Sequence, residues 1–220
     1  MSSSTEAPGK AVPEGAQTPS RRNYYAWALL TAALWAFPGF SLAGAPTEQI
    51  RGTIDRAIET LKDPALAAKG KREERRGLLR KEIAPAFDFA EMSKRSLGTR
   101  WRERTPEERN RFVVLFRELL ENSYLGKIEG YEGEAIRYGK ETVDGPYAVV
   151  KTLVVTRKGQ EIPVDYRMLV DGGKWRIYDV AIEGISLVNN YRSQFNSILQ
   201  KSSFAEMMEK LGATVREQKP

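Results

Sequence analysis

Cysteine and histidine are both absent from the 220 residues of this chain. Without cysteine there is no disulfide, no thiolate nucleophile and no cysteine-ligated metal. Without histidine the chain also lacks the commonest general base near neutral pH and a usual zinc ligand. Enzymatic activity is therefore disfavoured, although chemistry that uses only carboxylates remains open. We expect no catalytic residue, no metal site and no cofactor.

A long apolar run is missing as well. The longest run, residues 24–37, has about fourteen residues and is too short to span a bilayer comfortably. A polar leader rich in serine, proline, glycine and alanine precedes it and ends in Arg21 and Arg22. Positive residues, a short apolar core and then small residues are the pattern of a secretory signal peptide. We therefore expect residues 1–43 to be a disordered leader with a cleavable signal peptide.

The expected cleavage site follows Ala43, because cleavage after Ala45 would leave Pro46 directly behind the scissile bond. Residues 20–24 also resemble a weak twin-arginine signal, so Tat export is an alternative to the preferred Sec export. A short uncleaved membrane anchor is the other interpretation of the apolar run.

The formal charge of +6 comes from 35 lysines and arginines against 29 acidic residues. The basic residues are mostly interleaved with glutamates, as in residues 69–82, which is typical of a solvated helix face. No arginine-rich tail and no aromatic RNA-binding signature accompanies them. The charge pattern therefore predicts no nucleic-acid partner.

Helical periodicity dominates the first part of the exported chain. One apolar stripe predicts a helix with Thr47 as its N-cap and Asp63-Pro64 as its end. That stripe consists of Ile50, Ile54, Ala57, Ile58 and Leu61. Shorter helices are expected over 71–84 and 88–96, the second capped by Asp88 and closed by Gly98.

A long helix follows the clearest start signal in the chain. Thr105-Pro106-Glu107-Glu108 combines an N-cap, a proline at the first helical position and a glutamate three residues after the cap. This helix must lie against something apolar, because one broad face carries Phe112, Leu115, Phe116, Leu119, Leu120 and Tyr124.

Beyond residue 134 the period changes to two, which predicts an antiparallel meander of four strands. The expected strands are 134–142, 147–157, 161–170 and 174–182. Helical periodicity returns with a helix that begins near Ser186 and a final helix over 203–211 that Gly212 ends. Helices, a curved antiparallel sheet and covering C-terminal helices make an α+β cone, an architecture that commonly leaves an apolar cavity between sheet and helices.

Two stretches are distinctive. The first runs from Phe87 through Asp88 to Met92 and continues with Leu97-Gly98, Trp101 and Thr105-Pro106-Glu107. The second runs from Trp175 to Val180 and from Glu183 through Ile185-Ser186 to Phe195. With them, residues 47–212 resemble the MlaC family of toluene-tolerance, Ttg2-type proteins.

The resemblance implies an NTF2-like fold and one lipid-binding domain over residues 44–220. It also implies a periplasmic phospholipid carrier without enzymatic activity, the binding component of an ABC lipid-transport system that serves outer-membrane lipid asymmetry and solvent tolerance. The implied partners are phospholipid, an inner-membrane ABC transporter complex with its lipid-binding ring, and an outer-membrane lipoprotein complex, and the carrier itself is expected to be a monomer. A hopanoid-biosynthesis branch of the same family is the alternative for the cargo.

Candidate wall residues for the acyl chains come from the third strand, the long helix and the helix after Ser186. For any one of them, ordinary core packing is the default interpretation, so the hypothesis rests on the whole set. The set consists of Phe112, Phe116, Leu120, Tyr124, Ile162, Val164, Tyr166, Met168, Val170, Val188, Tyr191 and Phe195. Arg192 is the candidate contact for the phosphate of a lipid headgroup.

Two further interpretations stay open. A small NTF2-like enzyme would pair Tyr166 or Tyr178 with Asp165 or Asp179, but neighbouring residues of one strand do not all face one cavity. A structural adaptor would fill the cavity with its own side chains. For Asp179 we favour a structural ion pair or a cap for the helix near Ser186.

Overall fold

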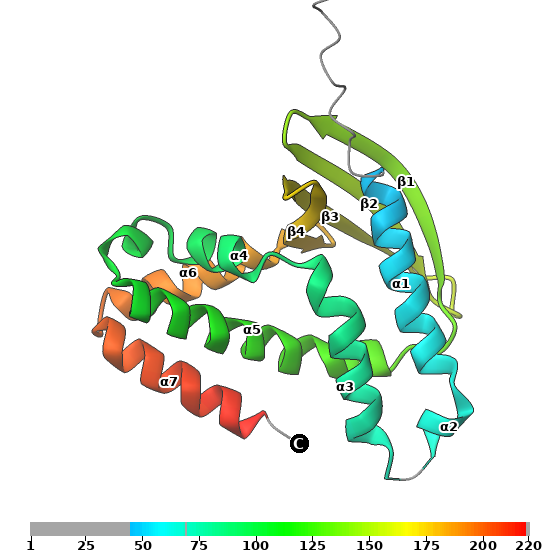
Figure 1. Cartoon of the computed structure of the whole chain (residues 1–220), viewed down its shortest axis with the longest axis horizontal. Helices are drawn as coiled ribbons and strands as arrows, with labels where there is room; N and C mark the ends of the chain where they lie inside the picture. Colours follow the sequence, from blue (N-terminus) through cyan, green and yellow to red (C-terminus); the bar gives the residue numbers. More distant parts are fainter. Residues whose placement is uncertain (1–44, 69, 219–220) are drawn as a thin grey trace, which may run out of the picture. The chain divides into compact units, whose positions relative to one another are not determined.

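Residues 45–68 and 70–218 are described by the computed structural model, and all of them belong to one unit that spans Ser41–Pro220 (Figure 1). The predicted signal peptide and its cleavage site after Ala43 lie outside the described residues. In the part of the chain that is described, no helix is both long enough and apolar enough to cross a membrane.

Three helices open the described chain: α1 (Pro46–Lys62), α2 (Pro64–Ala67) and α3 (Arg72–Ile83). The break between α1 and α2 lies where predicted, because Asp63 is extended before proline and caps α2 through the amide of Ala65. Thr47 is not an N-cap. The helix begins one residue earlier, at Pro46, and the amide of Thr47 donates to Glu141 Oε2 at 2.8 Å instead.

The next elements are η1 (Ala84–Ala86), α4 (Phe89–Leu97), η2 (Gly98–Glu103) and α5 (Pro106–Glu129). Their predicted caps are confirmed. The Asp88 carboxylate accepts from the amide of Glu91 at 2.8 Å, and Thr105 and Glu108 form a reciprocal capping box. Gly98 ends α4 with a φ of 58°, a conformation that glycine adopts without strain.

The sheet is an antiparallel meander in the order β1-β2-β3-β4-β5. The four predicted strands are present, and a two-residue fifth strand that was not predicted pairs with the end of β4. Their bounds are β1 (Ala135–Asp144), β2 (Tyr147–Val155), β3 (Glu161–Asp171), β4 (Lys174–Ile182) and β5 (Ile185–Ser186). Irregular pairing near Gly139 in β1 and near Tyr178 in β4 marks bulges, which bend a sheet.

Two helices complete the chain: α6 (Leu187–Leu199) and α7 (Phe204–Glu217). The prediction that Gly212 ends the last helix was wrong. Gly212 lies in the interior of α7, because Leu211 and Val215 continue the buried stripe on both sides of it.

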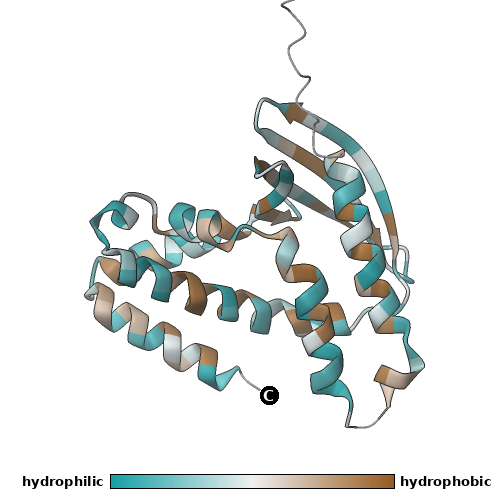
Figure 2. Ribbon diagram, in the orientation of Figure 1, coloured by the Kyte–Doolittle hydropathy of each residue, from teal (hydrophilic) through white to brown (hydrophobic). Residues whose placement is uncertain are grey.

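Two large apolar clusters, and a small one of Ala57, Leu79 and Leu125, hold these elements. The helical cluster lies between α4, α5, α6 and α7 and includes Phe112, Phe116 and Phe195. The sheet cluster lies between the inner face of the sheet, α1 and η1, and its largest member is Trp175, which is 1% exposed. Polar and apolar bands alternate along the helices and strands that contribute to these clusters (Figure 2). The helices and the antiparallel sheet make the predicted α+β architecture, and an NTF2-like cone is consistent with it.

A buried carboxylate joins the two clusters. Asp179 on β4 is 3% exposed and accepts hydrogen bonds from Arg167 Nη1 at 2.8 Å, the Ser186 hydroxyl at 2.6 Å and the amide of Val188 at 3.0 Å. Ser186 is itself the N-cap of α6. Asp179 therefore forms a structural ion pair, with Arg167 as a partner that the sequence did not indicate, and it also supports the cap of α6.

We expect Asp179→Ala to lower the free energy of unfolding by about 3 kcal/mol, because two buried donors, the Ser186 hydroxyl and the Val188 amide, and the partly exposed Arg167 lose their acceptor. Urea unfolding of the purified protein measures this change. Asp165→Ala is the matched control, since Asp165 lies on the same sheet without a comparable set of donors. Equal losses in the two variants would contradict the role given to Asp179.

Candidate functional site

A cavity of about 520 Å³ lies between the sheet and the helices α1, α3 and α5. Its volume falls within the range of roughly 300–1,000 Å³ that is typical of small-molecule sites. Helix α1 contributes the longest stripe of wall residues: Ile50, Thr53, Ile54, Ala57, Ile58 and Leu61. The remaining apolar wall comes from Leu79, Ile83, Ala84, Phe87, Phe89 and Met92, from Leu120, Tyr124, Leu125 and Ile128, and from Ile136, Val154, Ile162, Val164, Tyr166, Ile177, Val180, Ile182 and Leu187.

The inner face of the sheet is divided into a packed end and an open end. On β3, Met168 is fully buried in the sheet cluster, whereas Ile162, Val164 and Tyr166 on the same face are only half-buried and line the cavity. Alternate residues of a strand share one face, so all four side chains lie on the inner side of the sheet. The helices cover one end of this face closely and leave the other end facing an apolar space.

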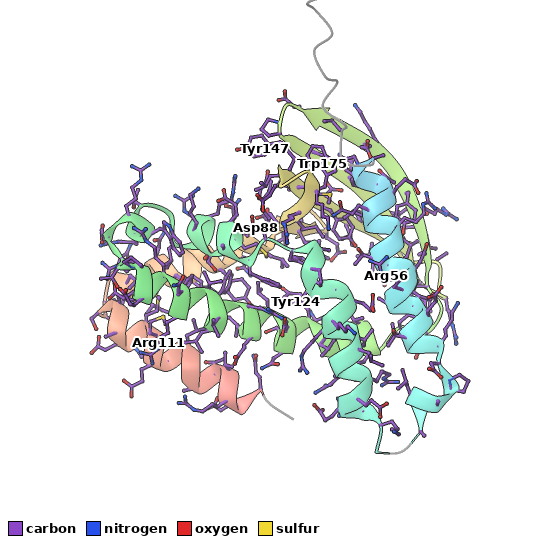
Figure 3. All side chains as sticks on the ribbon, in the orientation of Figure 1. Arg56, Asp88, Arg111, Tyr124, Tyr147 and Trp175 are labelled. Carbon is purple, nitrogen blue, oxygen red and sulfur yellow. The ribbon has the colours of Figure 1, made fainter. Side chains whose placement is uncertain are left out.

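Five of the predicted wall residues lie in this cavity. They come from the C-terminal half of α5 and the open end of β3, and they are Leu120, Tyr124, Ile162, Val164 and Tyr166. Tyr124 is labelled on α5 in Figure 3. The structure therefore brings together the two predicted elements, but only over part of their length.

Five other predicted residues belong to the helical cluster: Phe112, Phe116, Val188, Tyr191 and Phe195. The rings of Phe112 and Phe195 meet edge-to-face with centroids 5.3 Å apart, and the Phe116 and Tyr191 rings do so at 5.2 Å. These five residues miss the cavity because α5 is 24 residues long and extends well beyond it. Its first half packs against α6 and α7, so the same apolar face serves a core at one end and the cavity at the other.

Met168 and Val170 pack in the sheet cluster and do not line the cavity. Arg192 lies elsewhere too. It is exposed on α6, and its guanidinium packs over Gly98, where an added Cβ would lie 3.0 Å from Nη2. Leu187, the first residue of α6, lines the cavity, whereas Arg192, five residues further along the helix, is not among the lining residues.

The sequence prediction missed the wall that α1 and α3 provide. The stripe from Ile50 to Leu61 was identified as a helix face, but nothing in its periodicity distinguishes a cavity wall from a core contact. Half-burial marks part of the wall but not all of it, since the wall residues Leu79 and Leu120 are buried. Ile54, Ile58 and Leu61 are half-buried, whereas Ile50, at the closed end, is 2% exposed.

Polar side chains gather at one end of the cavity, where α5 leads into β1. Lys127 is exposed there, with its Nζ 5.1 Å from the centroid of the Tyr124 ring, and the Tyr131 hydroxyl donates to the carbonyl of Glu134 at 3.2 Å. Further from this end, about two turns before α5 finishes, Arg80 pairs with Glu121 across α3 and α5 at 3.7 Å. This end is therefore the wet end of an otherwise apolar space.

Deeper in the cavity the phenol of Tyr166 stays neutral, because desolvation by burial raises its pKa to about 12. The carboxylates of the alternative enzymatic pairing lie elsewhere. Asp179 is committed to Arg167, Ser186 and Val188, and Asp165 does not line the cavity. No cluster of three or more metal-ligating side chains occurs among the residues that the structure describes.

Ion pairs hold α3 against α5, in addition to the apolar contact of Leu79 and Leu125. Glu129, at the end of α5, accepts from Arg76 Nε at 2.9 Å and lies 3.5 Å from guanidinium nitrogens of Arg72 and Arg75. Burial acts to raise the pKa of the Glu129 carboxyl, but the hydrogen bonds and charges of Arg76 and Arg72 outweigh it and lower the pKa.

The family model described as MlaC protein matches residues 51–213 of the chain. The toluene tolerance protein ttg2D of Pseudomonas putida is 27% identical over 176 residues, which cover 79% of this chain and 82% of that protein. The binding protein MlaC of the Haemophilus influenzae intermembrane phospholipid transport system is 21% identical over 62% of this chain and 66% of its own length.

A solved structure is similar over most of the chain. It is the phospholipid-binding protein of Ralstonia solanacearum in complex with a phospholipid. It superposes with a TM-score of 0.71 at 23% identity, over 80% of this chain and 99% of that one. This similarity establishes the fold.

The Glu129 ion pairs should make stability depend on pH. Because the pKa is lowered in the folded state, their contribution is complete above the unfolded-state pKa of about 4.3 and is lost as the pH falls through the folded-state pKa. We expect Glu129→Gln to lower the free energy of unfolding at pH 7 by about 2 kcal/mol and to reduce the loss seen on acidification. Urea unfolding at several pH values tests this, with the exposed Glu132→Gln as control. An unchanged pH profile in Glu129→Gln would contradict it.

Proposed function

The chain belongs to the MlaC family, and on that basis we propose that it is a periplasmic phospholipid-binding component of an intermembrane lipid-transport system. The observation that supports this proposal is the cavity, whose walls are formed mostly by apolar side chains from α1, α3, α5 and the sheet. The names of the relatives, a toluene tolerance protein and the binding protein of a phospholipid transport system, support the same function.

The energetics favour such a cavity over a polar cleft. Burying one methylene contributes about 0.8 kcal/mol, so two acyl chains of roughly sixteen carbons represent on the order of 20 kcal/mol that a carrier must match. Apolar walls supply that match without chemistry, which agrees with a non-enzymatic carrier. A bound acyl chain would cover the half-buried residues of the cavity wall.

In this proposal the acyl chains contact the β3 residues Ile162, Val164 and Tyr166 on one side. Leu120 and Tyr124 of α5 and the α1 stripe contact them on the others. The headgroup lies at the wet end of the cavity, where Lys127 replaces Arg192 as the nearest candidate cation. Lys127 carries its charge on a flexible stem, so it can meet a phosphate without leaving the solvent.

The transport setting extends the proposal. The chain is exported by a cleavable signal peptide and acts without a cofactor. It exchanges cargo with an inner-membrane ABC transporter complex and an outer-membrane lipoprotein complex. A hopanoid is the alternative cargo, since a rigid apolar body also suits a space without dedicated polar groups at its closed end.

The cargo is identified by native mass spectrometry of the full protein purified from its native cells in mild buffer, followed by lipid extraction. We expect a bound diacyl phospholipid at about one per chain. A hopanoid would change the cargo but keep the carrier. A protein that is always recovered empty and does not take up phospholipid from vesicles would overturn the proposal.

Val164→Asp should abolish lipid loading, because it places a charge in the apolar wall where no partner can compensate it. Leu153→Asp is the matched control. Leu153 lies on β2 next to the wall residue Val154, so its side chain points to the opposite face of the sheet. Lipid is counted by native mass spectrometry and folding by circular dichroism. Full loading in a folded Val164→Asp protein would argue against these walls.

A further inference from the structure

A second hollow, of about 710 Å³, lies between α5 and α7 and shares no lining residue with the cavity. On the α5 side it is formed by residues between Asn110 and Leu115. On the α7 side its residues follow helical spacing along one stripe: Ala205, Met208, Glu209, Gly212 and Arg216. Arg111 is labelled beside α5 and α7 in Figure 3. We call this hollow the α5–α7 groove.

The floor of the groove is apolar and open. Val114 is 55% exposed, although its neighbours Phe112 and Phe116 on α5 are buried in the helical cluster. Gly212 lies opposite, and a Cβ added there would meet Arg216 Nη1 at 3.4 Å and Leu115 Cδ1 at 4.0 Å, which are ordinary contacts. Alanine would therefore fit at this position and would strengthen the helix interior. Glycine keeps the groove deep where packing alone would favour a side chain.

The charges on the rim lack partners. Arg111 and Arg216 are exposed, and neither makes an ion pair with another described residue. Arg117, nearly two turns further along α5, pairs with Glu121 at 2.6 Å. Glu209 is the acidic residue of the groove, so two arginines and one glutamate leave the rim with a net positive charge.

We propose that the α5–α7 groove is a docking site for an acidic amphipathic helix of a partner protein. A helix laid in a groove between two helices presents apolar residues at spacings of three and four, which Val114, Leu115 and Met208 would receive. Carboxylates beside that apolar stripe would pair with Arg111 and Arg216. Exposed arginine around an apolar floor is the composition of energetically important contacts.

The contact is small and suits a transient encounter. The α7 wall extends from Ala205 to Arg216, which corresponds to about three helical turns. Interfaces of this size are weak and short-lived. The inference extends beyond lipid binding and needs no cargo, because the groove and the cavity use different residues.

The test begins with photo-crosslinking of the full chain in its native cells. Benzoylphenylalanine replaces Val114 in the groove or, as control, Val143 on β1, which is 47% exposed. We expect Val114 to crosslink to one protein, and mass spectrometry to map the crosslink to a helical, acidic segment of it. The control position should not give this product. Crosslinks only to a second copy of the chain, only to lipid, or to no protein would overturn the proposal.

The mapped segment is then synthesised, and its binding to the purified protein is measured by fluorescence anisotropy. Arg216→Glu should weaken binding about tenfold or more, and high salt should weaken it in the wild type. Lys201→Glu is the matched control, because it makes the same charge change at an exposed residue outside the groove. Equal binding by Arg216→Glu and the wild type would overturn the proposal.

The variant Gly212→Ala distinguishes an effect on peptide docking from an effect on protein stability. The added methyl group should raise the melting temperature, since alanine favours the helix interior, while it fills the groove and weakens peptide binding. Both effects should leave lipid loading unchanged, so failure of docking and failure of the carrier function are distinguishable. A Gly212→Ala protein that binds the peptide as well as the wild type would contradict docking in the depth of the groove.

Discussion

Asp179 is buried at the end of β4, where its carboxylate accepts hydrogen bonds from β3, from the N-cap residue of α6 and from the first turn of α6. A buried carboxylate is costly unless such donors satisfy it, so the three elements are held in one arrangement. That arrangement fixes the start of α6, where Leu187 lines the cavity and the next residue, Val188, packs in the helical cluster. The open end of the inner face is then left to α1, α3 and the end of α5, which surround the cavity without filling it.

Local chemistry predicted most of the fold because the decisive signals are local. The Asp88 cap, the capping box at Thr105 and the glycine at 98 each act within a few residues, and each lies where the sequence indicated. Alternation along β3 likewise indicated its apolar face. Thr47 and Gly212 were misplaced because each could be a helix end locally, while a neighbouring proline or a continuing buried stripe decided otherwise.

The candidate site was only half predictable for a different reason. Phe116 and Leu120 are one turn apart on the same face of α5, yet one is in the helical cluster alone and the other also lines the cavity. Their environments differ because a different element lies opposite each residue, and the periodicity of a sequence does not indicate which element that is. The same holds for α1, whose stripe from Ile50 to Leu61 passes from a core contact into a cavity wall. The position of the facing helix therefore decides whether an apolar residue packs in a core or lines the site.

Helix α5 carries both proposed surfaces, on different residues. Its last turns, from Leu120 to Ile128, line the cavity, whereas Arg111, Val114 and Leu115 line the groove with α7. Between them Phe112 and Phe116 are fully buried among Phe195 and other side chains of the helical cluster, which fixes the helix as one rigid body. A carrier needs a cargo wall that exchanges its contents and a docking surface that keeps its shape. Placing both on one helix, separated by a close-packed aromatic core, keeps the groove intact whether the cavity is empty or filled.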